Sequence, residues 1–272
     1  MEKYTLITGA SSGIGKSFAT YFAKEKNNLI IVARSKQKLT NLKMELEQKY
    51  QIKIITLIYD LTIPNISVDI YNYTQRKDIF VDKLINCAGY GLSGYVDDLS
   101  YEKQHDQIML NSVALFDMTK LFLNPMLRNN EGIIINVAST SGYHPIPTMS
   151  VYAASKSFVL SFTESLATEY EKSNVKILAL SPGATDTNFF SEGGGVSYGS
   201  LRTPDHVVSV SMKAINNKKI SKIDGFNNYF TSTFLPRLLT RKKMASMVYN
   251  IMKKQIEKSW YFETYWGIKV SN

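Results

Sequence analysis

Cysteine is almost absent from the sequence: Cys87 is the only one in 272 residues. A single cysteine excludes an internal disulfide bond and is typical of a reducing compartment. No uninterrupted apolar run approaches the roughly 20 residues that a membrane-spanning helix needs. The N-terminal segment MEKYTLITGASSG also lacks the basic stretch and apolar run of a signal peptide. Together these absences predict a cytoplasmic protein.

Histidine is scarce as well, and the three present, His105, His144 and His206, show no metal-ligand spacing. The net charge is +9 and the pI about 9.3, which fits nucleic acid, an anionic cofactor or a generally lysine-rich background. The sequence has no zinc spacing, no aromatic RNA-binding signature and no basic recognition helix. We therefore expect neither a metal site nor nucleic-acid binding.

Short segments rich in Ile, Leu and Val alternate with longer segments of helical periodicity. The apolar segments are expected to be strands buried on both faces, as in a parallel sheet. They cover residues 3–8, 28–33, 52–58, 82–86, 132–138 and 175–180. Helical periodicity covers residues 14–26, 36–50, 101–128 and 151–172, and less clearly 65–77. Repeated strand–helix–strand units predict an α/β fold with a Rossmann-type, doubly wound parallel sheet flanked by helices.

The first expected strand runs directly into the segment TGASSGIG, residues 8–15. A glycine-rich turn between a first strand and a first helix places backbone N–H groups and a helix N-terminus against a pyrophosphate. Gly9 would permit the tight turn, Gly13 would let the backbone approach the phosphates, and Gly15 would let the helix pack on the strand. The segment therefore predicts dinucleotide binding.

The end of the second expected strand predicts which dinucleotide is bound. An acidic residue there accepts hydrogen bonds from the ribose 2′-OH of NAD, whereas an arginine suits the 2′-phosphate of NADP. Here Ala33 stands in place of the acid, Arg34 follows it, and Ser35 and Lys36 come next. NADP(H) is therefore favoured over NAD(H), although Lys36 alone would also suit the surface of a helix.

The segment SVYAASKSFVLSF, residues 150–162, carries Tyr152 and Lys156 four residues apart. Residues at this spacing lie one above the other on one face of a helix. Such a pair commonly belongs to a solvated flank. The small residues around it, Ala153, Ala154 and Ser155, leave a second interpretation open, in which ligands approach this face closely.

These motifs together resemble the short-chain dehydrogenase/reductase family, in particular bacterial NADP-preferring members. The resemblance extends from Tyr4 to about Phe190. After the glycine loop it uses, in the family's order, DLT at 60–62, NCAG at 86–89, Asn111 in MLNSVALF, Ser139 thirteen residues before Tyr152, and SPGATDT at 181–187. Cys87 departs from the family's Asn-Asn-Ala-Gly at its second position. Each motif alone has a structural explanation, and their order carries the resemblance.

The resemblance implies an NADPH-dependent oxidoreductase that reduces an apolar ketone, 3-oxoacyl or similar carbonyl compound by hydride transfer. It implies Tyr152 as general acid/base, with Lys156 lowering the phenol pKa from about 10 and holding the nicotinamide ribose. Ser139 would bind the substrate oxygen. Asn111 would hold a water that connects Lys156 to solvent. A cofactor-sensing regulatory protein on the same fold is the alternative, and the intact catalytic set favours the enzyme.

The implied cofactor contacts come from the same motifs, with Asp60 at the adenine and the Pro-Gly segment at the nicotinamide. The full set is Gly9, Ser11, Ser12, Gly13, Ile14, Gly15, Arg34, Asp60, Leu61, Asn86, Ala88, Gly89, Tyr152, Lys156, Pro182, Gly183, Thr185 and Thr187. Residues 1–190 would form the dinucleotide-binding core with the catalytic residues. Residues 191–272 would form a substrate-binding lid and helical appendage of the same domain.

The residues expected around the substrate are mainly apolar, unless several of them pack in the core instead. They are Tyr90, Leu92, Tyr143, Ile146, Met149, Phe189 and Phe190. The glycine-rich segment 189–200 is interpreted either as a mobile lid or as a plain surface connection. The small-molecule partner would therefore be an apolar carbonyl compound or its alcohol.

The C-terminal part has few motifs. A helix is predicted to start at Thr203, Pro204 and Asp205, and the segment KIDGFNN predicts a last strand and turn.

Residues 237–258 carry seven Lys or Arg and one Glu. This composition predicts a basic amphipathic helix that packs on the surface or makes weak peripheral contact with an anionic membrane. The aromatic segment 260–266 is expected to dock on the body or a partner. The family resemblance implies a homodimer or homotetramer through the two long helices at 101–128 and 151–172.

Overall fold

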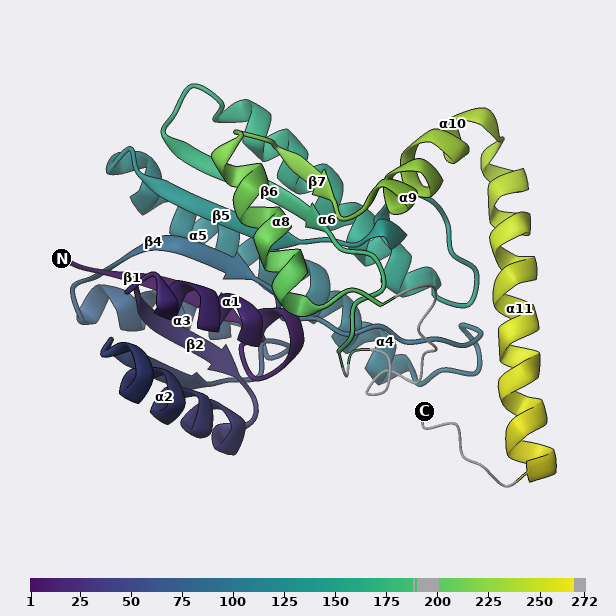
Figure 1. Ribbon diagram of the computed structural model, residues 1–272, viewed down its shortest axis with the longest axis horizontal. Helices are drawn as coiled ribbons and strands as arrows, with labels where there is room; N and C mark the ends of the chain where they lie inside the picture. Colours follow the sequence, from purple (N-terminus) through teal and green to yellow (C-terminus); the bar gives the residue numbers. More distant parts are fainter. Residues whose placement is uncertain (188, 190–200, 267–272) are drawn as a thin grey trace.

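The computed structural model of the chain describes residues 1–187, Phe189 and residues 201–266, with side chains up to residue 253. A parallel sheet of seven strands forms its centre, in the order β3-β2-β1-β4-β5-β6-β7 (Figure 1). The strands are β1 (Glu2–Thr8), β2 (Asn28–Ala33), β3 (Ile54–Ile58), β4 (Ile79–Asn86), β5 (Gly132–Val137), β6 (Val175–Ser181) and β7 (Ser221–Ile223). The strand order reverses between β1 and β4, and ligands of such sheets bind at this point, beyond the carboxyl ends of the strands.

Helices cover both faces of the sheet and confirm the predicted doubly wound class. One face carries α1 (Gly13–Lys24), α2 (Lys36–Tyr50) and α8 (Pro204–Asn216). The other carries α3 (Ile66–Arg76), α5 (Leu115–Arg128) and α6 (Ser150–Glu169), with α4 (Tyr101–Ile108) beside α6. Thr203 caps α8 as predicted, because its hydroxyl accepts a hydrogen bond from the His206 N–H at 3.2 Å.

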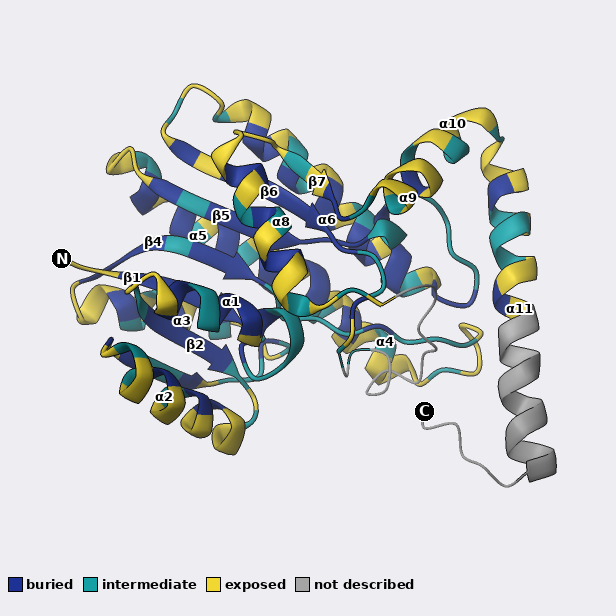
Figure 2. Cartoon of the chain, viewed as in Figure 1, coloured by how far each residue is buried: buried dark blue, intermediate teal, exposed yellow. Residues whose placement is uncertain are grey.

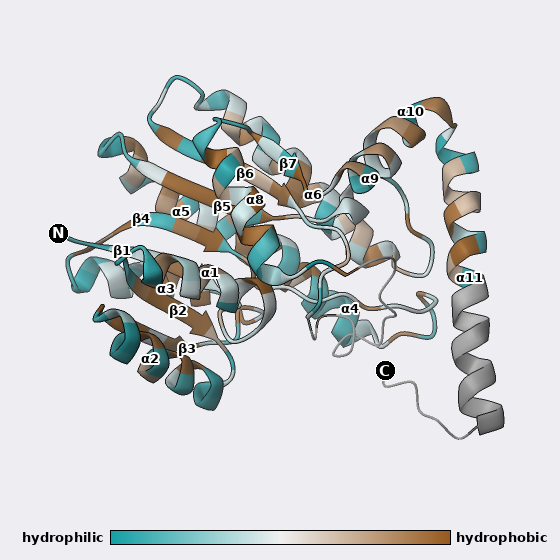
Figure 3. Cartoon of the chain, in the orientation of Figure 1, coloured by the Kyte–Doolittle hydropathy of each residue, from teal (hydrophilic) through white to brown (hydrophobic). Residues whose placement is uncertain are grey.

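The core consists of the two apolar layers between sheet and helices. The inner strands are dark blue in Figure 2 and brown in Figure 3, because both of their faces are buried and apolar. In β2, for example, Leu29, Ile30, Ile31 and Val32 are all fully buried. Each buried aliphatic side chain of this kind contributes about 1.5–3 kcal/mol relative to an exposed one. The continuous Ile/Leu/Val runs of the sequence therefore fold as central parallel strands.

Two expected helices differ from the structure. The segment 101–128 is interrupted by the π-helix η1 (Met109–Ala114), which separates α4 from α5. The segment 237–258 is broken at Leu239, whose backbone is extended. There the short helix α10 (Leu235–Leu238) ends, and α11 (Arg241–Trp266) begins after Thr240, whose hydroxyl accepts a hydrogen bond from the Lys243 N–H at 3.3 Å.

A further helical stretch runs from Phe226 to Leu238, and only its last two residues were expected to be helical from the sequence. It consists of α9 (Phe226–Tyr229), the π-helix η3 (Phe230–Phe234) and α10. Together with α11 it extends beyond the carboxyl end of the sheet (Figure 1). No helix in the described ranges is both long enough and apolar enough to cross a membrane.

Candidate active site

A cavity of about 650 Å³ lies at the carboxyl ends of the central strands. All predicted catalytic and cofactor-binding residues line it except Asn86 and Asn111. They come from the loops that follow six strands, from the start of α1 and from α6. The fold thus brings together motifs that are spread over about 180 residues of sequence, as expected at a topological switch point.

The glycine loop is shaped for close approach of a ligand to its backbone. Gly9 has a φ of +67°, and a Cβ there would lie 2.9 Å from the backbone of Ala88. A Cβ on Gly15 would collide with the Gly9 carbonyl oxygen. The Thr8 hydroxyl accepts hydrogen bonds from the N–H groups of Cys87 and Ala88, both at 3.0 Å, and so ties this loop to the end of β4. Such a loop before the N-terminus of α1 fits the pyrophosphate of a dinucleotide.

Arg34 lies at the same end of the cavity, directly after β2. Its Nη1 lies 3.8 Å from Oδ2 of Asp60, and the arginine side chain is largely exposed. Asp60 also accepts hydrogen bonds from the backbone N–H and the hydroxyl of Thr62, at 3.0 and 2.8 Å. Lys38, on the first turn of α2, adds a second cation to the cavity wall. The two cations can bind an anionic group at this point.

Ser139, Tyr152 and Lys156 form a buried cluster at the middle of the cavity. The Lys156 ammonium donates a hydrogen bond to the Val137 carbonyl oxygen at 2.8 Å, and its Nζ lies 5.9 Å from the centre of the Tyr152 ring. Burial lowers the pKa of Lys156 to about 8. Burial raises the pKa of Tyr152 to about 12, against a smaller lowering by a hydrogen bond with the Ser139 hydroxyl.

The direction of the Tyr152 shift differs from the expectation that Lys156 lowers the pKa of the phenol. Desolvation of a fully buried phenol outweighs the other influences, and the ammonium of Lys156 is turned towards a backbone carbonyl. The protein groups alone therefore keep Tyr152 protonated at neutral pH, as a proton donor must be.

Asn111 lies behind the cluster, fully buried on the π-helix η1. Its Nδ2 donates hydrogen bonds to the Tyr90 carbonyl oxygen at 2.9 Å and to the Ser155 hydroxyl at 3.2 Å, and its Oδ1 accepts one from the Tyr90 N–H at 3.2 Å. A Cβ on Gly89 would lie 2.9 Å from that Oδ1 and 3.6 Å from Lys156 Nζ. Asn111 thus fixes the loop after β4 against α6, close to Lys156. Single-turn π-helices are frequent at functional sites.

Asn86 does not line the cavity, although the family resemblance includes it among the cofactor contacts. Its Nδ2 donates hydrogen bonds to the Thr119 hydroxyl at 3.0 Å and to Asn136 Oδ1 at 2.9 Å. Asn136 Nδ2 in turn donates to the Thr163 hydroxyl at 3.0 Å. Asn86 is therefore part of a buried polar network that links β4 and β5 to α5 and α6.

The other end of the cavity is apolar. Tyr152 belongs here to an apolar cluster with Ile146, Met149, Phe189, Val248 and Met252. The ring centroids of Tyr152 and Phe189 lie 5.5 Å apart. Of the expected substrate-pocket residues, four line the cavity: Tyr90, Ile146, Met149 and Phe189. Leu92 and Tyr143 do not, and Phe190 with the rest of the expected lid lies outside the described residues.

Sequence reasoning missed the contribution of α11. Val248 and Met252 line the cavity one helical turn apart, and the hydroxyls of Tyr249 and Tyr95 lie 3.0 Å apart across the same junction. A spacing of four apolar residues in a helix indicates a packed face, but it does not say what that face packs against. The aromatic segment expected to dock, 260–266, belongs to α11, and its side chains lie outside the described part.

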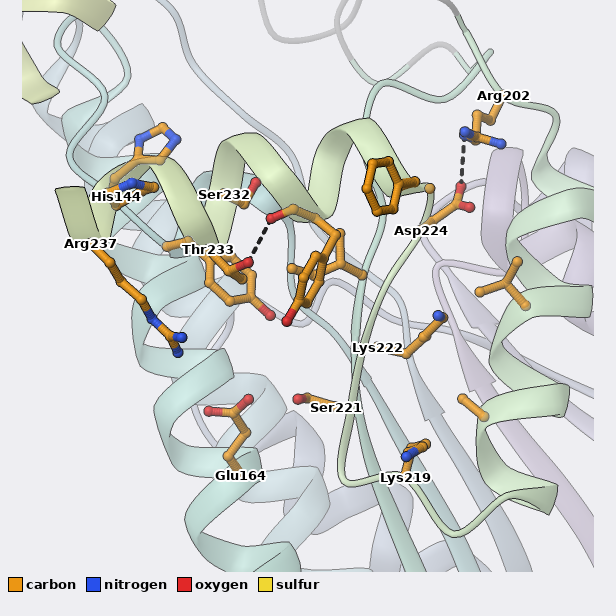
Figure 4. Close-up of a pocket in the computed structure, with 18 of the residues that line it drawn as sticks. His144, Glu164, Arg202, Lys219, Ser221, Lys222, Asp224, Ser232, Thr233 and Arg237 are labelled. Carbon is orange, nitrogen blue, oxygen red and sulfur yellow. Dashed lines mark hydrogen bonds and ion pairs between the residues drawn. The ribbon is translucent and has the colours of Figure 1, made fainter. Parts of the chain in front are cut away.

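A second hollow, of about 1210 Å³, lies beside the edge strand β7 (Figure 4). Tyr143 belongs to this hollow, together with Arg202, Asp224 and residues from the helical stretch after β7. The Arg202 Nε lies 3.5 Å from the buried carboxylate of Asp224, which His206 approaches to 3.1 Å on its other oxygen. This cluster joins the start of α8 to the end of β7. Across the described residues, no group of His, Cys, Asp and Glu side chains could hold a metal ion.

Comparison with known proteins identifies the family. The model of a family described as short chain dehydrogenase matches residues 3–193. The chain is 30% identical over 236 residues to a 7beta-hydroxysteroid dehydrogenase of Mediterraneibacter gnavus, covering 84% of this chain and 89% of that one. It is 31% identical over 186 residues to an uncharacterized oxidoreductase of Staphylococcus epidermidis, covering 68% and 79%.

Solved structures agree with this family. A short-chain dehydrogenase from Sphingobium yanoikuyae in complex with NADPH superposes with a TM-score of 0.78 and 28% identity, over 88% of this chain and 94% of the other. A bulky-bulky ketone specific alcohol dehydrogenase from Comamonas testosteroni gives 0.76 and 26%, over 90% and 94%. The chain belongs to the short-chain dehydrogenase/reductase family, and it is an NAD(P)-dependent oxidoreductase.

Proposed function

We propose that the protein is an NADPH-dependent reductase that converts an apolar ketone or 3-oxoacyl compound into an alcohol. One observation carries the proposal. The hydroxyls of Ser139 and Tyr152 lie where the glycine-loop end of the cavity meets the apolar end formed by residues such as Met149 and Met252. A carbonyl oxygen at this junction would meet two hydroxyl donors, while the rest of its molecule would meet aliphatic and aromatic side chains.

The catalytic roles follow from these positions. Bound nicotinamide supplies the hydride that the carbonyl carbon accepts. Tyr152 gives its phenolic proton to the carbonyl oxygen, and the Ser139 hydroxyl donates a hydrogen bond to the same oxygen. Lys156, with a pKa of about 8, is mainly a cation at neutral pH and stabilises the phenolate that the proton transfer leaves. Asn111 holds the backbone that surrounds Lys156.

The preference for NADPH over NADH is supported by charge. Arg34 and Lys38 line the cavity beyond the end of β2, where NAD-binding folds of this type carry an acidic residue. Asp60 is already held by Thr62 and lies beside Arg34. An extra phosphate on the adenosine ribose would bind the two cations, whereas a ribose hydroxyl would leave them unused.

A series of straight-chain methyl ketones of increasing length tests the proposal, with NADPH absorbance as the readout. Each further methylene buried in the apolar end contributes up to about 0.8 kcal/mol, or about fourfold in kcat/KM. We expect kcat/KM to climb with length and then level off once the cavity is filled. A flat series, or a preference for sugars and polyols, would contradict the apolar substrate. A 7beta-hydroxysteroid dehydrogenase and a bulky-bulky ketone specific enzyme among the similar proteins are consistent with a large apolar substrate.

We also propose that the protein is a homodimer or homotetramer assembled through α5 and α6. Phe116 and Phe158 are both about two-fifths exposed. Phe158 stacks on Phe162 at a centroid distance of 5.7 Å, and Phe116 meets Phe162 edge-on at 5.6 Å. Exposed aromatic clusters of this kind are typical of interfaces. Light scattering of a Phe116→Ser, Phe158→Ser variant should show dissociation, and an unchanged mass would remove this surface from the interface.

The division into a core (1–190) and a cap (191–272) is part of the same proposal, because α11 contributes to the apolar end of the cavity. We also propose that the protein is cytoplasmic, because a single cysteine is typical of proteins in a reducing compartment.

A further inference from the structure

The helical stretch from Phe226 to Leu238 has an unusual distribution of polarity. Phe226, Phe230, Phe234 and Leu238 recur at every fourth residue, so they lie along one side of the stretch. All four are exposed, by between 44% and 79%. The rings of Phe230 and Phe234 stack on each other at 5.1 Å, and of the four residues only Phe226 lines the hollow beside β7.

Another side of the same stretch lines the hollow beside β7, and it carries polar residues together with Tyr229 and Pro236. Ser232 is buried, and Ser232, Thr233 and Arg237 line the hollow beside β7 (Figure 4). An ordinary surface helix does the reverse, burying its apolar stripe and exposing its polar face. The apolar stripe, defined as Phe226, Phe230, Phe234 and Leu238, therefore lacks the burial that such a stripe normally has.

The charged side chains that residues 225–253 themselves carry all have one sign. Arg237, Arg241, Lys242 and Lys243 are exposed at the junction of α10 and α11. Residues 225–256 contain no Asp or Glu at all. This part of the surface therefore attracts an anionic partner, and nothing in the segment itself neutralises it.

These observations favour one kind of binding partner for the apolar stripe and the neighbouring cations. A second copy that packed through this surface about a two-fold axis would bring the same cations together, which is unfavourable. A nucleic acid would use the cations but would leave the stacked Phe230 and Phe234 without apolar partners. An anionic bilayer surface can bind both the cations and the apolar stripe. Its headgroups bind Lys and Arg, while aromatic and aliphatic side chains enter the headgroup–acyl boundary.

We propose that the apolar stripe and the cations of residues 241–243 dock the protein on the surface of an anionic lipid bilayer. The surface adjoins α11, whose Val248 and Met252 line the apolar end of the cavity while Ile251, on another side of the helix, is half-exposed. Docking brings the apolar end of the cavity close to the bilayer. A carbonyl compound dissolved in the lipid then reaches the site without crossing water, a consequence that rests on the proposed function.

Sedimentation of the full chain with vesicles tests the docking without any enzyme assay. We expect binding to phosphatidylcholine vesicles that contain phosphatidylglycerol, little binding to pure phosphatidylcholine, and weaker binding at high salt. Replacing Arg241, Lys242 and Lys243 by Gln should lower the partition coefficient about a hundredfold, at about fivefold for each cation. The matched control replaces Lys24, Lys49 and Lys77 by Gln, three exposed cations at the opposite end of the sheet, and should bind within about threefold of the wild type.

The double variant Phe230→Ser, Phe234→Ser separately tests how much the apolar stripe contributes to vesicle binding. Both rings are about half exposed, so the variant is expected to fold and to bind NADPH as the wild type does, and to lose vesicle binding at least about tenfold. The proposal would be overturned if the triple variant at 241–243 and its control lost vesicle binding equally. It would also be overturned if the wild type did not bind anionic vesicles at low salt. A changed oligomeric mass of the Phe variant would overturn it as well, because it would assign the stripe to a second copy. Reduction of a water-soluble ketone in the absence of vesicles reports on the proposed function alone.

Discussion

The glycine-loop end of the cavity, which we propose as the cofactor end, consists of backbone and short loops that directly follow the strands. The apolar end, which we propose as the substrate end, consists of side chains from segments far apart in sequence. At the cofactor end, Gly9 and Gly15 approach other backbone atoms so closely that a Cβ does not fit. At the substrate end, Ile146, Phe189 and Met252 meet only through the folded chain. The first end tolerates little change, while the second can change its shape by exchanging one side chain.

A large loss of turnover is expected at the boundary between the two ends. Lys156→Met should reduce kcat by at least about a hundredfold, because it removes the cation that stabilises the Tyr152 phenolate. It should also weaken NADPH binding, since the ammonium lies within the cofactor-binding cavity. Steady-state kinetics with NADPH titration separate the two effects. Loss of turnover with unchanged NADPH affinity would place the role of Lys156 in the proton transfer alone.

Arg34 tests the cofactor end. Hydrogen bonds to charged groups contribute about 1.5–3 kcal/mol, so Arg34→Leu should weaken NADPH about tenfold to a hundredfold and leave NADH nearly unchanged. Lys36→Leu is the matched control, because Lys36 is exposed and does not line the cavity. Fluorescence titration with both cofactors measures the affinities. An equal loss for NADPH and NADH would make Arg34 a structural residue and remove the basis for the NADP preference.

The buried Lys156 also predicts a pH dependence of stability in the protein without cofactor. Burial lowers its pKa from 10.5 to about 8, so between these values the unfolded chain binds more protons than the folded protein and stability rises with pH. The unfolding free energy of the wild type, relative to Lys156→Met, should therefore increase by about 2 kcal/mol between pH 7 and 9.5. Urea denaturation at the two pH values measures this. If the unfolding free energies of the wild type and of Lys156→Met change equally between the two pH values, Lys156 is well solvated.

The smallest effect is expected at the substrate end. Val248→Phe adds a ring to the apolar wall and should lower kcat/KM for long methyl ketones by about fivefold, with short ketones and NADPH affinity little affected. Ile251→Phe is the control, because Ile251 lies on the same helix but does not line the cavity. If both variants behave alike in the ketone series, α11 does not form part of the substrate site.

The two ends also differ in how far the sequence predicts them. The glycine loop, Ser139 and Tyr152 follow strands or begin helices that hydrophobic periodicity identifies, so local motifs are enough to predict that they meet in one cavity. Val248 and Met252 have no such motif, because their contact with Met149 depends on the path of the chain after β7. That path includes the stretch from Phe226 to Leu238, where exposed aromatic residues hide the usual helical pattern.

Smaller differences between the prediction from sequence and the structure also have local causes. The π-helix around Asn111 has a helical sequence pattern, which does not distinguish it from an α-helix. Asn86 matches the family motif in sequence, yet successive side chains of a strand point to opposite faces, and its amide points into the network with Thr119 and Asn136. A motif therefore predicts where the chain passes more reliably than what each side chain contacts.

Tyr152 provides the most direct test of the account, because the proposal assigns it the proton that makes an alcohol from a carbonyl. Tyr152→Phe keeps the ring that packs on Phe189 and removes only the hydroxyl. We expect kcat for methyl ketone reduction to fall about a thousandfold while the Kd for NADPH stays within about twofold of the wild type. Turnover within about tenfold of the wild type, with NADPH bound normally, would contradict the assignment of Tyr152 as the acid.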